Sequence, residues 1–199
     1  MEMTTTKVQN DTKYPVYIVL GSGGHTAEMC TINMALLSSS RGKEIYNPLR
    51  YIIANDDITS RSRITSAMQK VGVALDDTSF IYVPRSRKVG QSYFSSVFTT
   101  LWALLWSCWL VWRDQPKLLL CNGPGTCVPF CLATSICRRI GRLPNTTRIV
   151  FVESWCRVRT LSLSGKLMRP MLDLLVVQWP ALAEKYKNAY NVKYFGKIM

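Results

Sequence analysis

Two glycine-rich segments and a single histidine are the parts of this sequence best suited to chemistry. The first segment follows an apolar run and reads, in order, Gly21, Ser22, Gly23, Gly24 and His25. Consecutive glycines between a strand and a helix let backbone N–H groups converge on an anion at the start of the helix, where the helix dipole favours negative charge. The third glycine of a dinucleotide-binding fingerprint is missing, and so is the lysine of a P-loop. Taken alone, the segment is as typical of a tight turn with close helix packing as of a phosphate-binding loop.

His25 is the only histidine among the 199 residues. Its ordinary pKa of about 6.5 suits a general base that removes a proton from a sugar hydroxyl. Because it follows the first expected strand, it should face the crevice at the carboxyl ends of the strands, where α/β proteins bind ligands. Glu28, three residues further on, is placed to orient the ring or to cap the helix. The competing interpretation is a histidine that only hydrogen-bonds the backbone.

A second glycine-rich segment, residues 122–126, follows the fourth expected strand and provides Gly123, Gly125 and Thr126. In the usual doubly wound order the first and fourth strands are neighbours, so both segments should face one crevice. The two phosphates of a diphosphate could then be shared between them. Glu153, which is followed by Ser154 directly after the fifth expected strand, is a third candidate at the same edge.

Strands and helices are expected to alternate along the whole chain. The apolar runs that predict strands lie at residues 14–20, 49–54, 80–83, 117–121, 148–152 and 173–178. Helices are expected at residues 25–37, 58–71 and 92–112, from the second glycine-rich segment to 139, and at 180–188. Strands this apolar need cover on both faces, so the pattern predicts an α/β fold with a doubly wound, Rossmann-like parallel sheet. We expect one domain over residues 1–199, with a flexible stretch at 1–13.

The formal net charge of +13 predicts an anionic partner, which can be nucleic acid, a phosphorylated ligand or an anionic membrane surface. The basic residues are spread over several loops without a helix-turn-helix or RNA-binding signature, so nucleic acid is not the expected partner. Seven cysteines occur without a C-x-x-C pair, which favours reduced thiols. With a single histidine beside them, we expect neither a metal site nor a cofactor.

Residues 89–112 carry no charged side chain and hold four of the six tryptophans. Small side chains at 92, 96, 99, 103 and 107 form one stripe of the expected helix, and bulky ones at 94, 98, 102, 105 and 109 form a nearly opposite stripe. A membrane span would place the early and late strands on opposite sides of the bilayer. The pattern therefore favours a helix at the membrane interface over a buried helix or a span. The membrane-facing residues would be Phe94, Phe98, Trp102, Trp106, Trp109 and Trp112.

Five blocks in chain order resemble the Alg14-like family of eukaryotic oligosaccharide-biosynthesis proteins. They are GSGGHTAEM at 21–29, PRSRKVGQS at 84–92, CNGPGTCVP at 121–129, FVESWCRV at 151–158 and LSGKLMRPMLDLLVVQWP at 163–180. The match covers nearly the whole chain from Tyr14. The family is similar in turn to the N-terminal, acceptor-side half of the bacterial lipid-linked N-acetylglucosaminyltransferase, which has a GT-B fold. That second resemblance rests on G-x-G-G-H and the second glycine-rich segment.

The resemblance implies one subunit, inactive alone, of a two-subunit inverting UDP-N-acetylglucosamine transferase. A separate small subunit would bind most of the UDP-N-acetylglucosamine, and this chain would recruit it to the cytosolic face of the endoplasmic reticulum membrane. The acceptor would be dolichyl-diphosphate-N-acetylglucosamine, which receives its second N-acetylglucosamine in N-glycan precursor assembly. By motif, His25 and Glu153 would be catalytic, and the acceptor diphosphate would bind Gly21, Ser22, Gly23, Gly24, Gly123, Gly125 and Thr126.

Family members are expected to contact the partner through the last stretch, residues 186–199, where Tyr194, Phe195 and Gly196 are the candidates. A plain terminal strand or tail is the alternative. Many family members begin with a membrane-spanning segment, which is not expected here. Anchoring would then depend on residues 89–112 and on basic side chains, namely Arg61, Arg63, Arg85, Arg87, Lys88, Arg138, Arg139 and Arg142. The main alternative to the whole assignment is a self-sufficient, soluble nucleotide-binding α/β enzyme.

Overall fold

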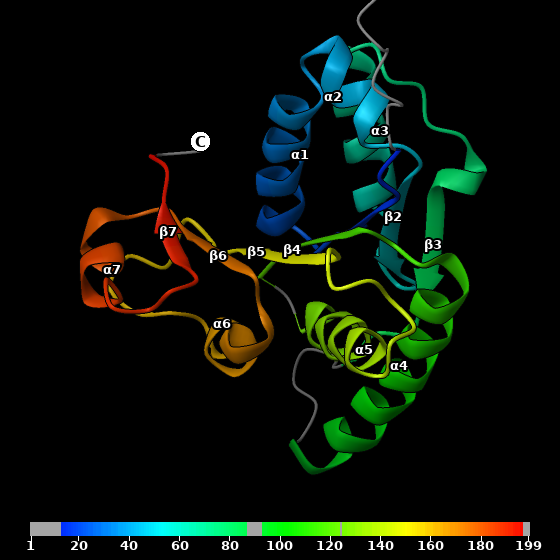
Figure 1. The fold of residues 1–199 in the computed structure, drawn as a ribbon. Helices are drawn as coiled ribbons and strands as arrows, with labels where there is room; N and C mark the ends of the chain where they lie inside the picture. The colour runs from blue at the N-terminus through cyan, green and yellow to red at the C-terminus, as the bar shows by residue number, and fades with distance from the viewer. Residues whose placement is uncertain (1–12, 87–92, 124, 197–199) are drawn as a thin grey trace, which may run out of the picture.

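A seven-stranded parallel sheet in the order β3-β2-β1-β4-β5-β6-β7 forms the centre of the protein (Figure 1). The computed structural model describes residues 13–86, 93–123 and 125–196. The strands are β1 (Val16–Val19), β2 (Leu49–Ala54), β3 (Phe80–Val83), β4 (Leu118–Asn122), β5 (Arg148–Val152), β6 (Leu174–Val177) and β7 (Val192–Tyr194). The strand order reverses between β1 and β4, which pair side by side. This is the switch point at which doubly wound sheets bind ligands.

The strands are apolar because both faces of the sheet are covered. In β1, Val16 and Ile18 point into one core, whereas Tyr17 and Val19 point into the other. None of the four is more than 1% exposed. Successive side chains of a strand alternate between the two faces, so every position of β1 has to suit a buried site.

Helices α1 and α3 cover one face of the sheet, and α4, α5 and α6 cover the other (Figure 1). The helices are α1 (Gly24–Leu36), α2 (Ser40–Ile45), α3 (Ser60–Lys70), α4 (Tyr93–Asp114), α5 (Cys127–Arg139), α6 (Leu163–Met168) and α7 (Pro180–Lys185), with 3-10 turns at Asp77–Ser79 and Arg169–Met171. Leu182 of α7 joins the same core as α5. The predicted fold class, a doubly wound parallel sheet, is confirmed.

The sequence pattern missed two short helices, gave the last strand only as an alternative, and drew the last helix too long. Strand β7 has only three residues and owes its form to parallel pairing with β6. Helices α2 and α6 have six residues each, and each starts with a serine whose hydroxyl accepts from a glycine N–H three residues on. Such N-caps are readable in a sequence, but no apolar period supports them here. The last helix was expected to reach 188, and α7 ends at Lys185.

Helix α4 has the two faces that its sequence predicted. Ala103 and Ser107 are 4% and 1% exposed, and Leu110 and Val111 are buried beside them. The opposite side leaves eight side chains 40–65% exposed, and we call these the aromatic face of α4: Val97, Phe98, Leu101, Trp102, Leu105, Trp106, Trp109 and Trp112. The side chain of Phe94 lies outside the described residues. Within the described part of the chain, no helix is both long enough and apolar enough to cross a bilayer.

Candidate active site

The two glycine-rich segments meet at the carboxyl ends of β1 and β4, as the strand order requires. His25 stands in the first turn of α1, and its ring packs against the backbone of Gly123. Gly123 has a φ of +76°, and a Cβ added there would collide with three atoms of the imidazole. The backbone conformation and the ring therefore both require glycine at this position. The predicted convergence of the two segments is confirmed.

A hydrogen-bonded chain of three side chains fixes the imidazole. Nδ1 of His25 lies 2.9 Å from Oδ1 of Asn122, and Nδ2 of Asn122 donates to Oε2 of Glu28 at 2.7 Å. Asn122 is fully buried at the end of β4, and Glu28 is 5% exposed. The side chain of His25 is 34% exposed, so the ring is supported from within and open to a ligand from outside.

The loop after β5 holds Glu28 from its other side. Oε1 of Glu28 accepts from Oγ of Ser154 at 2.9 Å and from the backbone N–H of Trp155 at 3.0 Å. Burial alone would raise the pKa of Glu28, but the nearby imidazole of His25 and the hydrogen bonds from Asn122, Ser154 and Trp155 outweigh burial and lower that pKa. The carboxylate is therefore ionised at neutral pH.

The pKa of His25 is raised above its ordinary value. The largest cause is the carboxylate of Glu28, whose Oε2 lies 3.7 Å from Nδ1. Burial opposes this rise, and the hydrogen bond with Asn122 and the charge of Glu153 add to it. The site thus holds a stronger base than a histidine free in water.

The turn before α1 is anchored to α3 on its inner side. Oγ1 of Thr26 hydrogen-bonds the carbonyl of Gly21 and lies 2.7 Å from Oγ of Ser60. Oγ of Ser60 in turn donates to Asp57 at 2.5 Å. These contacts are buried, whereas the predicted loop residues Ser22, Gly23 and Gly24 are exposed. Their backbone therefore faces the solvent side of the turn, where a ligand can approach.

Helix α5 presents a second N-terminus to the same edge. It begins at Cys127, after the exposed Gly125 and the buried Thr126. Among the described residues, neither N-cap position, Gly23 for α1 or Thr126 for α5, satisfies its helix with a side-chain hydrogen bond. First-turn N–H groups and the positive ends of two helix dipoles favour a bound anion here.

Glu153 ends β5 at this edge, but its carboxylate is engaged by the protein. It is fully buried, and its Oε2 accepts from N and Oγ of Ser162 at 2.9 and 3.0 Å. Gly165 leaves room for it, since a Cβ there would lie 2.6 Å from Oε2. This corrects the expectation that Glu153 acts on the acceptor, because the carboxylate has no exposed surface. Its contacts instead fix the 154–162 loop that supports Glu28.

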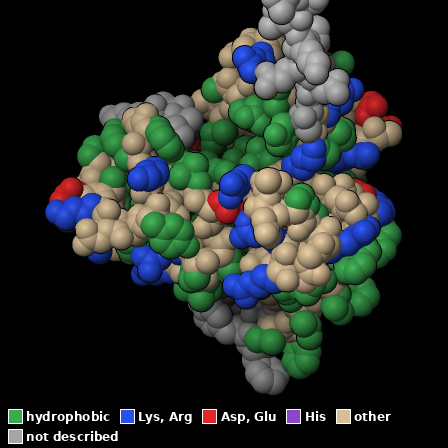
Figure 2. All heavy atoms as spheres, viewed as in Figure 1, with side chains coloured by type: hydrophobic (Ala, Val, Ile, Leu, Met, Phe, Trp, Pro, Cys, Tyr) green, Lys and Arg blue, Asp and Glu red, His purple; other side chains and the backbone are tan. Residues whose placement is uncertain are grey.

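Cationic side chains border the aromatic face of α4. The guanidinium of Arg113 lies 4.7 Å from the centre of the Trp109 ring, and that of Arg142 lies 4.8 Å from the centre of the Trp112 ring. Figure 2 shows hydrophobic side chains along the outer side of α4, at the lower right of the view, with Lys and Arg side chains nearby.

Other basic residues expected at a membrane are engaged within the protein. Arg138 pairs with Asp173 at 2.7 Å at a part-buried position, and Arg85 pairs with Asp56 at 2.8 Å. Arg61 pairs with Asp77. These contacts weaken the expectation that all the basic side chains face lipid. Arg87 and Lys88 lie outside the described residues.

The chain's last described segment forms the edge of the sheet. Strand β7 pairs with β6 and is the terminal strand in the sheet order. Phe195, directly after it, is 69% exposed, and Gly196 has a φ of +96°. An edge strand followed by an exposed aromatic side chain offers both backbone and apolar contacts to another polypeptide.

Comparison with known proteins decides the family. A family model described as "Oligosaccharide biosynthesis protein Alg14 like" matches residues 16–198. The "UDP-N-acetylglucosamine transferase subunit ALG14" of Mus musculus is 43% identical over 189 residues, which cover 92% of this chain and 82% of the relative. The subunit of the same name from Schizosaccharomyces pombe is 38% identical over 184 residues, which cover 91% of this chain and 81% of the relative.

This chain belongs to the Alg14-like family. The resemblance carried by the five sequence blocks is confirmed.

Solved structures of larger proteins share the fold of this Alg14-like chain. MurG from Acinetobacter baumannii gives a TM-score of 0.57 at 11% identity, over 93% of this chain and 45% of that protein. A putative UDP-N-acetylglucosamine 2-epimerase from Listeria monocytogenes gives a TM-score of 0.57 at 12% identity, over 91% of this chain and 44% of that protein. At such identities the likeness concerns the fold alone. The chain spans less than half the length of either protein.

Sequence reasoning pointed to His25, to both glycine-rich segments and to Glu28 as a residue that could orient the ring, but it did not assign Asn122 or Trp155 of this Alg14-like chain to that role. Asn122 was noted only as the start of a loop, and Trp155 only within a motif. A usable signal was present for Asn122, because it is a polar residue that ends a run of buried apolar residues at the switch point. Ser154 and Trp155 contact Glu28, which is more than 120 positions away, so no local sequence pattern predicts these contacts.

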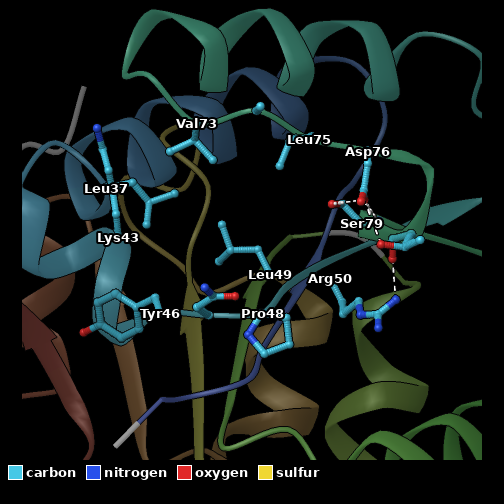
Figure 3. A pocket seen from close by; sticks show the side chains of 13 residues that line it. Leu37, Lys43, Tyr46, Pro48, Leu49, Arg50, Val73, Leu75, Asp76 and Ser79 are labelled. Carbon is cyan, nitrogen blue, oxygen red and sulfur yellow. Dashed lines mark hydrogen bonds between the residues drawn. The ribbon is translucent and has the colours of Figure 1, made fainter. Parts of the chain in front are cut away.

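A cavity of about 300 Å³ lies at the opposite, amino-terminal edge of the strands (Figure 3). Apolar side chains such as Leu49 and Val73 line much of it. Its polar groups bond to one another: Arg50 donates to the carbonyl of Thr78, and Asp76 accepts from Oγ of Ser79 at 2.9 Å. The groups suited to catalysis lie at the carboxyl edge, so we place the active site there.

Proposed function

We propose that this chain is the acceptor-side subunit of a two-subunit UDP-N-acetylglucosamine transferase that adds the second N-acetylglucosamine to dolichyl-diphosphate-N-acetylglucosamine. The observation that carries the proposal is the imidazole of His25, packed on Gly123 between two helix N-termini, in a chain of the Alg14-like family. Relatives 42–43% identical bear the name of a UDP-N-acetylglucosamine transferase subunit. That name describes a subunit, which supports a division of the enzyme between polypeptides.

His25 is the proposed general base. Its Nε2 removes the proton from the 4-hydroxyl of the acceptor sugar, and the 4-oxygen forms a bond to C1 of the donor sugar. The bond from C1 to the UDP oxygen breaks with inversion, and UDP leaves with the electron pair. Base catalysis of this kind contributes roughly 10²–10⁴-fold to a rate. The raised pKa of His25 supports the role, because a stronger base accepts the hydroxyl proton more readily.

The acceptor diphosphate would lie across the first turns of α1 and α5. The exposed backbone of Ser22, Gly23 and Gly24 would bind one phosphate, and Gly125 with Thr126 would bind the other. The side chain of Arg63 donates to the carbonyl of Gly23 at 3.1 Å, so a cation already stands beside the first loop. Helix N-termini and a guanidinium are the groups that bind phosphate in many unrelated folds.

The aromatic face of α4 would bring the complex to the cytosolic face of the endoplasmic reticulum membrane. Exposed apolar patches this extensive mark interaction sites on soluble domains. Tryptophan is enriched at headgroup depth, and Arg142 would meet anionic headgroups there, with Arg113 beside it in an ion pair with Asp114. Binding by one interfacial face with a few cations is reversible, which fits recruitment better than permanent anchoring.

The donor-binding subunit would contact the sheet edge formed by β7 and the residues after it. Tyr194, Phe195 and Gly196 are the proposed contacts, since Phe195 is exposed and the strand stands at the end of the sheet. In this arrangement UDP-N-acetylglucosamine is bound mainly by the partner, and the chain alone has no transferase activity.

Transfer of labelled N-acetylglucosamine from UDP to dolichyl-diphosphate-N-acetylglucosamine tests the proposal. The chain is assayed alone, with the small partner subunit, and with the partner after His25→Gln. We expect product only in the mixture, and a loss of at least roughly 10²-fold with His25→Gln. Circular dichroism and co-purification check that the variant folds and binds the partner. Full activity of the folded His25→Gln mixture would remove His25 from the role of base.

Calorimetry separates this proposal from a self-sufficient nucleotide-binding enzyme. The isolated chain should bind UDP-N-acetylglucosamine weakly, because the donor half is on the other polypeptide. Sub-micromolar binding of the nucleotide sugar by the chain alone would contradict the division into donor and acceptor subunits.

A further inference from the structure

We propose that Asn122 and Glu28 are positioning residues that hold His25 in the tautomer with its proton on Nδ1, leaving the lone pair of Nε2 free. The catalytic meaning of this inference rests on the function proposed above, but the tautomer is a property of the chain alone. It follows from four hydrogen bonds, two of them buried and two part-buried.

The orientation of the Asn122 amide is decided by Glu28. An ionised carboxylate can only accept hydrogen bonds, so the amide group 2.7 Å from Oε2 has to be the NH₂. The amide oxygen then faces the imidazole, 2.9 Å from Nδ1. A carbonyl oxygen can only accept, so Nδ1 has to carry the proton. In a neutral ring this leaves Nε2 unprotonated.

Glu28 is itself held in the form that this relay needs. Three donors converge on it, from Asn122, Ser154 and Trp155, and they keep its carboxylate ionised and oriented. A protonated or rotated Glu28 could accept from the amide or donate to it, and the orientation of Asn122 would no longer be fixed. The loop after β5 therefore controls, through Glu28 and Asn122, which nitrogen of His25 is the base.

Asn122 and Glu28 change which tautomer of the neutral histidine is the more populated. In water a neutral histidine side chain favours the proton on Nε2, the form in which Nε2 cannot act as a base. Nδ1 is turned toward the interior and engaged with Asn122, so Nε2 is the nitrogen left for the acceptor. A protein that made only packing contacts with the ring would leave the Nε2–H tautomer dominant. The Glu28–Asn122 pair reverses that preference before substrate binds.

The single histidine of the chain makes the tautomer measurable without assignment. Long-range ¹H–¹⁵N spectra of the isolated, ¹⁵N-histidine-labelled chain, recorded above the pKa of the ring, report which nitrogen carries the proton. We expect Nδ1–H in the wild type. Asn122→Ala and Glu28→Gln should each shift the population toward Nε2–H, whereas Asn122→Asp, which keeps an acceptor beside Nδ1, should retain Nδ1–H.

Asn33→Ala is the matched control. Asn33 is also fully buried, lies on α1 and donates to the carbonyl of Met29 at 2.8 Å, so its loss removes a buried amide away from the imidazole. It should lower stability and leave the tautomer unchanged. A wild-type ring protonated on Nε2, or a tautomer that Asn122→Ala does not move, would overturn the inference.

The transferase assay then connects the tautomer to the reaction. With the partner present, Asn122→Ala should lower kcat by roughly 10²-fold, with the KM for donor unchanged. If Asn122→Ala moves the tautomer but kcat stays at the wild-type value, positioning of the base is refuted. If the tautomer follows the expectation but no mixture has transferase activity, the inference stands and the proposed function fails.

Discussion

Replacing Gly123 by alanine should lower the free energy of unfolding by more than backbone strain alone can explain. A residue with a Cβ at a φ of +76° costs about 1–2 kcal/mol, of which the less flexible unfolded chain returns about 0.4–1 kcal/mol. The new methyl also occupies the position of the imidazole, so His25 has to move. Moving it breaks the bond to Asn122 and leaves a fully buried amide oxygen without its partner, which costs about 1–3 kcal/mol more. We expect a total loss of about 1–5 kcal/mol, larger by about 1–3 kcal/mol than the backbone effect alone.

Gly141→Ala provides the backbone-only comparison. Gly141 has a φ of +77° after the end of α5, and no described atom lies within 4 Å of where its Cβ would stand. This variant should lose at most about 1.6 kcal/mol, since it combines the same strain with the same unfolded-state gain. Urea unfolding of both variants measures the difference, and the imidazole resonances of His25 should shift only in Gly123→Ala. Equal losses in the two variants, with an unmoved His25 signal, would refute the packing of the ring on Gly123.

Three further predictions test the electrostatics, the supporting loop and the surface. Because the folded pKa of His25 is raised, its stabilising contribution is full below its unfolded pKa of about 6.5 and is lost as pH rises through the folded value. Glu28→Gln should lower the pKa of His25 in an NMR titration and shrink that pH dependence, and an unchanged pKa would contradict the role of Glu28. Ser162→Ala removes the hydroxyl that caps α6 and donates to Oε2 of Glu153, while the backbone N–H at this position still donates to that oxygen. We expect a loss of about 1–3 kcal/mol in urea unfolding, and no loss would mean that the 154–162 loop is loosely held. Replacing Trp102 and Trp109 by serine should abolish flotation with anionic liposomes while stability changes by only about 0.5 kcal/mol per residue. A variant that no longer folds, as shown by its far-UV circular dichroism, would mean that the two rings belong to the core.

The sheet was predictable from the sequence because its signal is local and repeated. Each predicted strand is a short, mainly apolar run, such as residues 118–121 before Asn122. Because both faces are buried, the strands lack the alternation of polar and apolar residues that is typical of a sheet with one face exposed to solvent. The two faces of α4 were equally visible, because small and aromatic residues fall at helical spacing on opposite sides. Helices α2 and α6 and strand β7 gave no such period, and they depend on pairing or caps supplied by the folded chain.

The site was only half predictable, for a physical reason. The type of His25 and its place after the first strand pointed to the switch point, and the second glycine-rich segment pointed to the same crevice. The assignment of Glu153 failed because two carboxylates, Glu28 and Glu153, end up at one edge and the sequence gives no measure of their burial. The carboxylate that lies near the ring is decided by the hydrogen-bond donors around each of the two. These donors come from residues far apart in the sequence, as in the contact between Asn122 and Glu28, which are more than 90 positions apart.

The same carboxylate that selects the tautomer also raises the pKa of His25, and substrate binding should change that balance. In the free protein, the positive ends of α1 and α5 favour the neutral ring, whereas Glu28 favours the protonated one. A diphosphate bound at those helix ends brings negative charge close to His25 and occupies the groups that opposed protonation. The histidine of the acceptor complex should therefore be more basic than that of the free chain. Since kcat/KM reports the free enzyme and kcat the complex, the pH at which activity rises should be higher for kcat than for kcat/KM. Coincident midpoints in the two profiles would mean that the diphosphate does not bind beside His25.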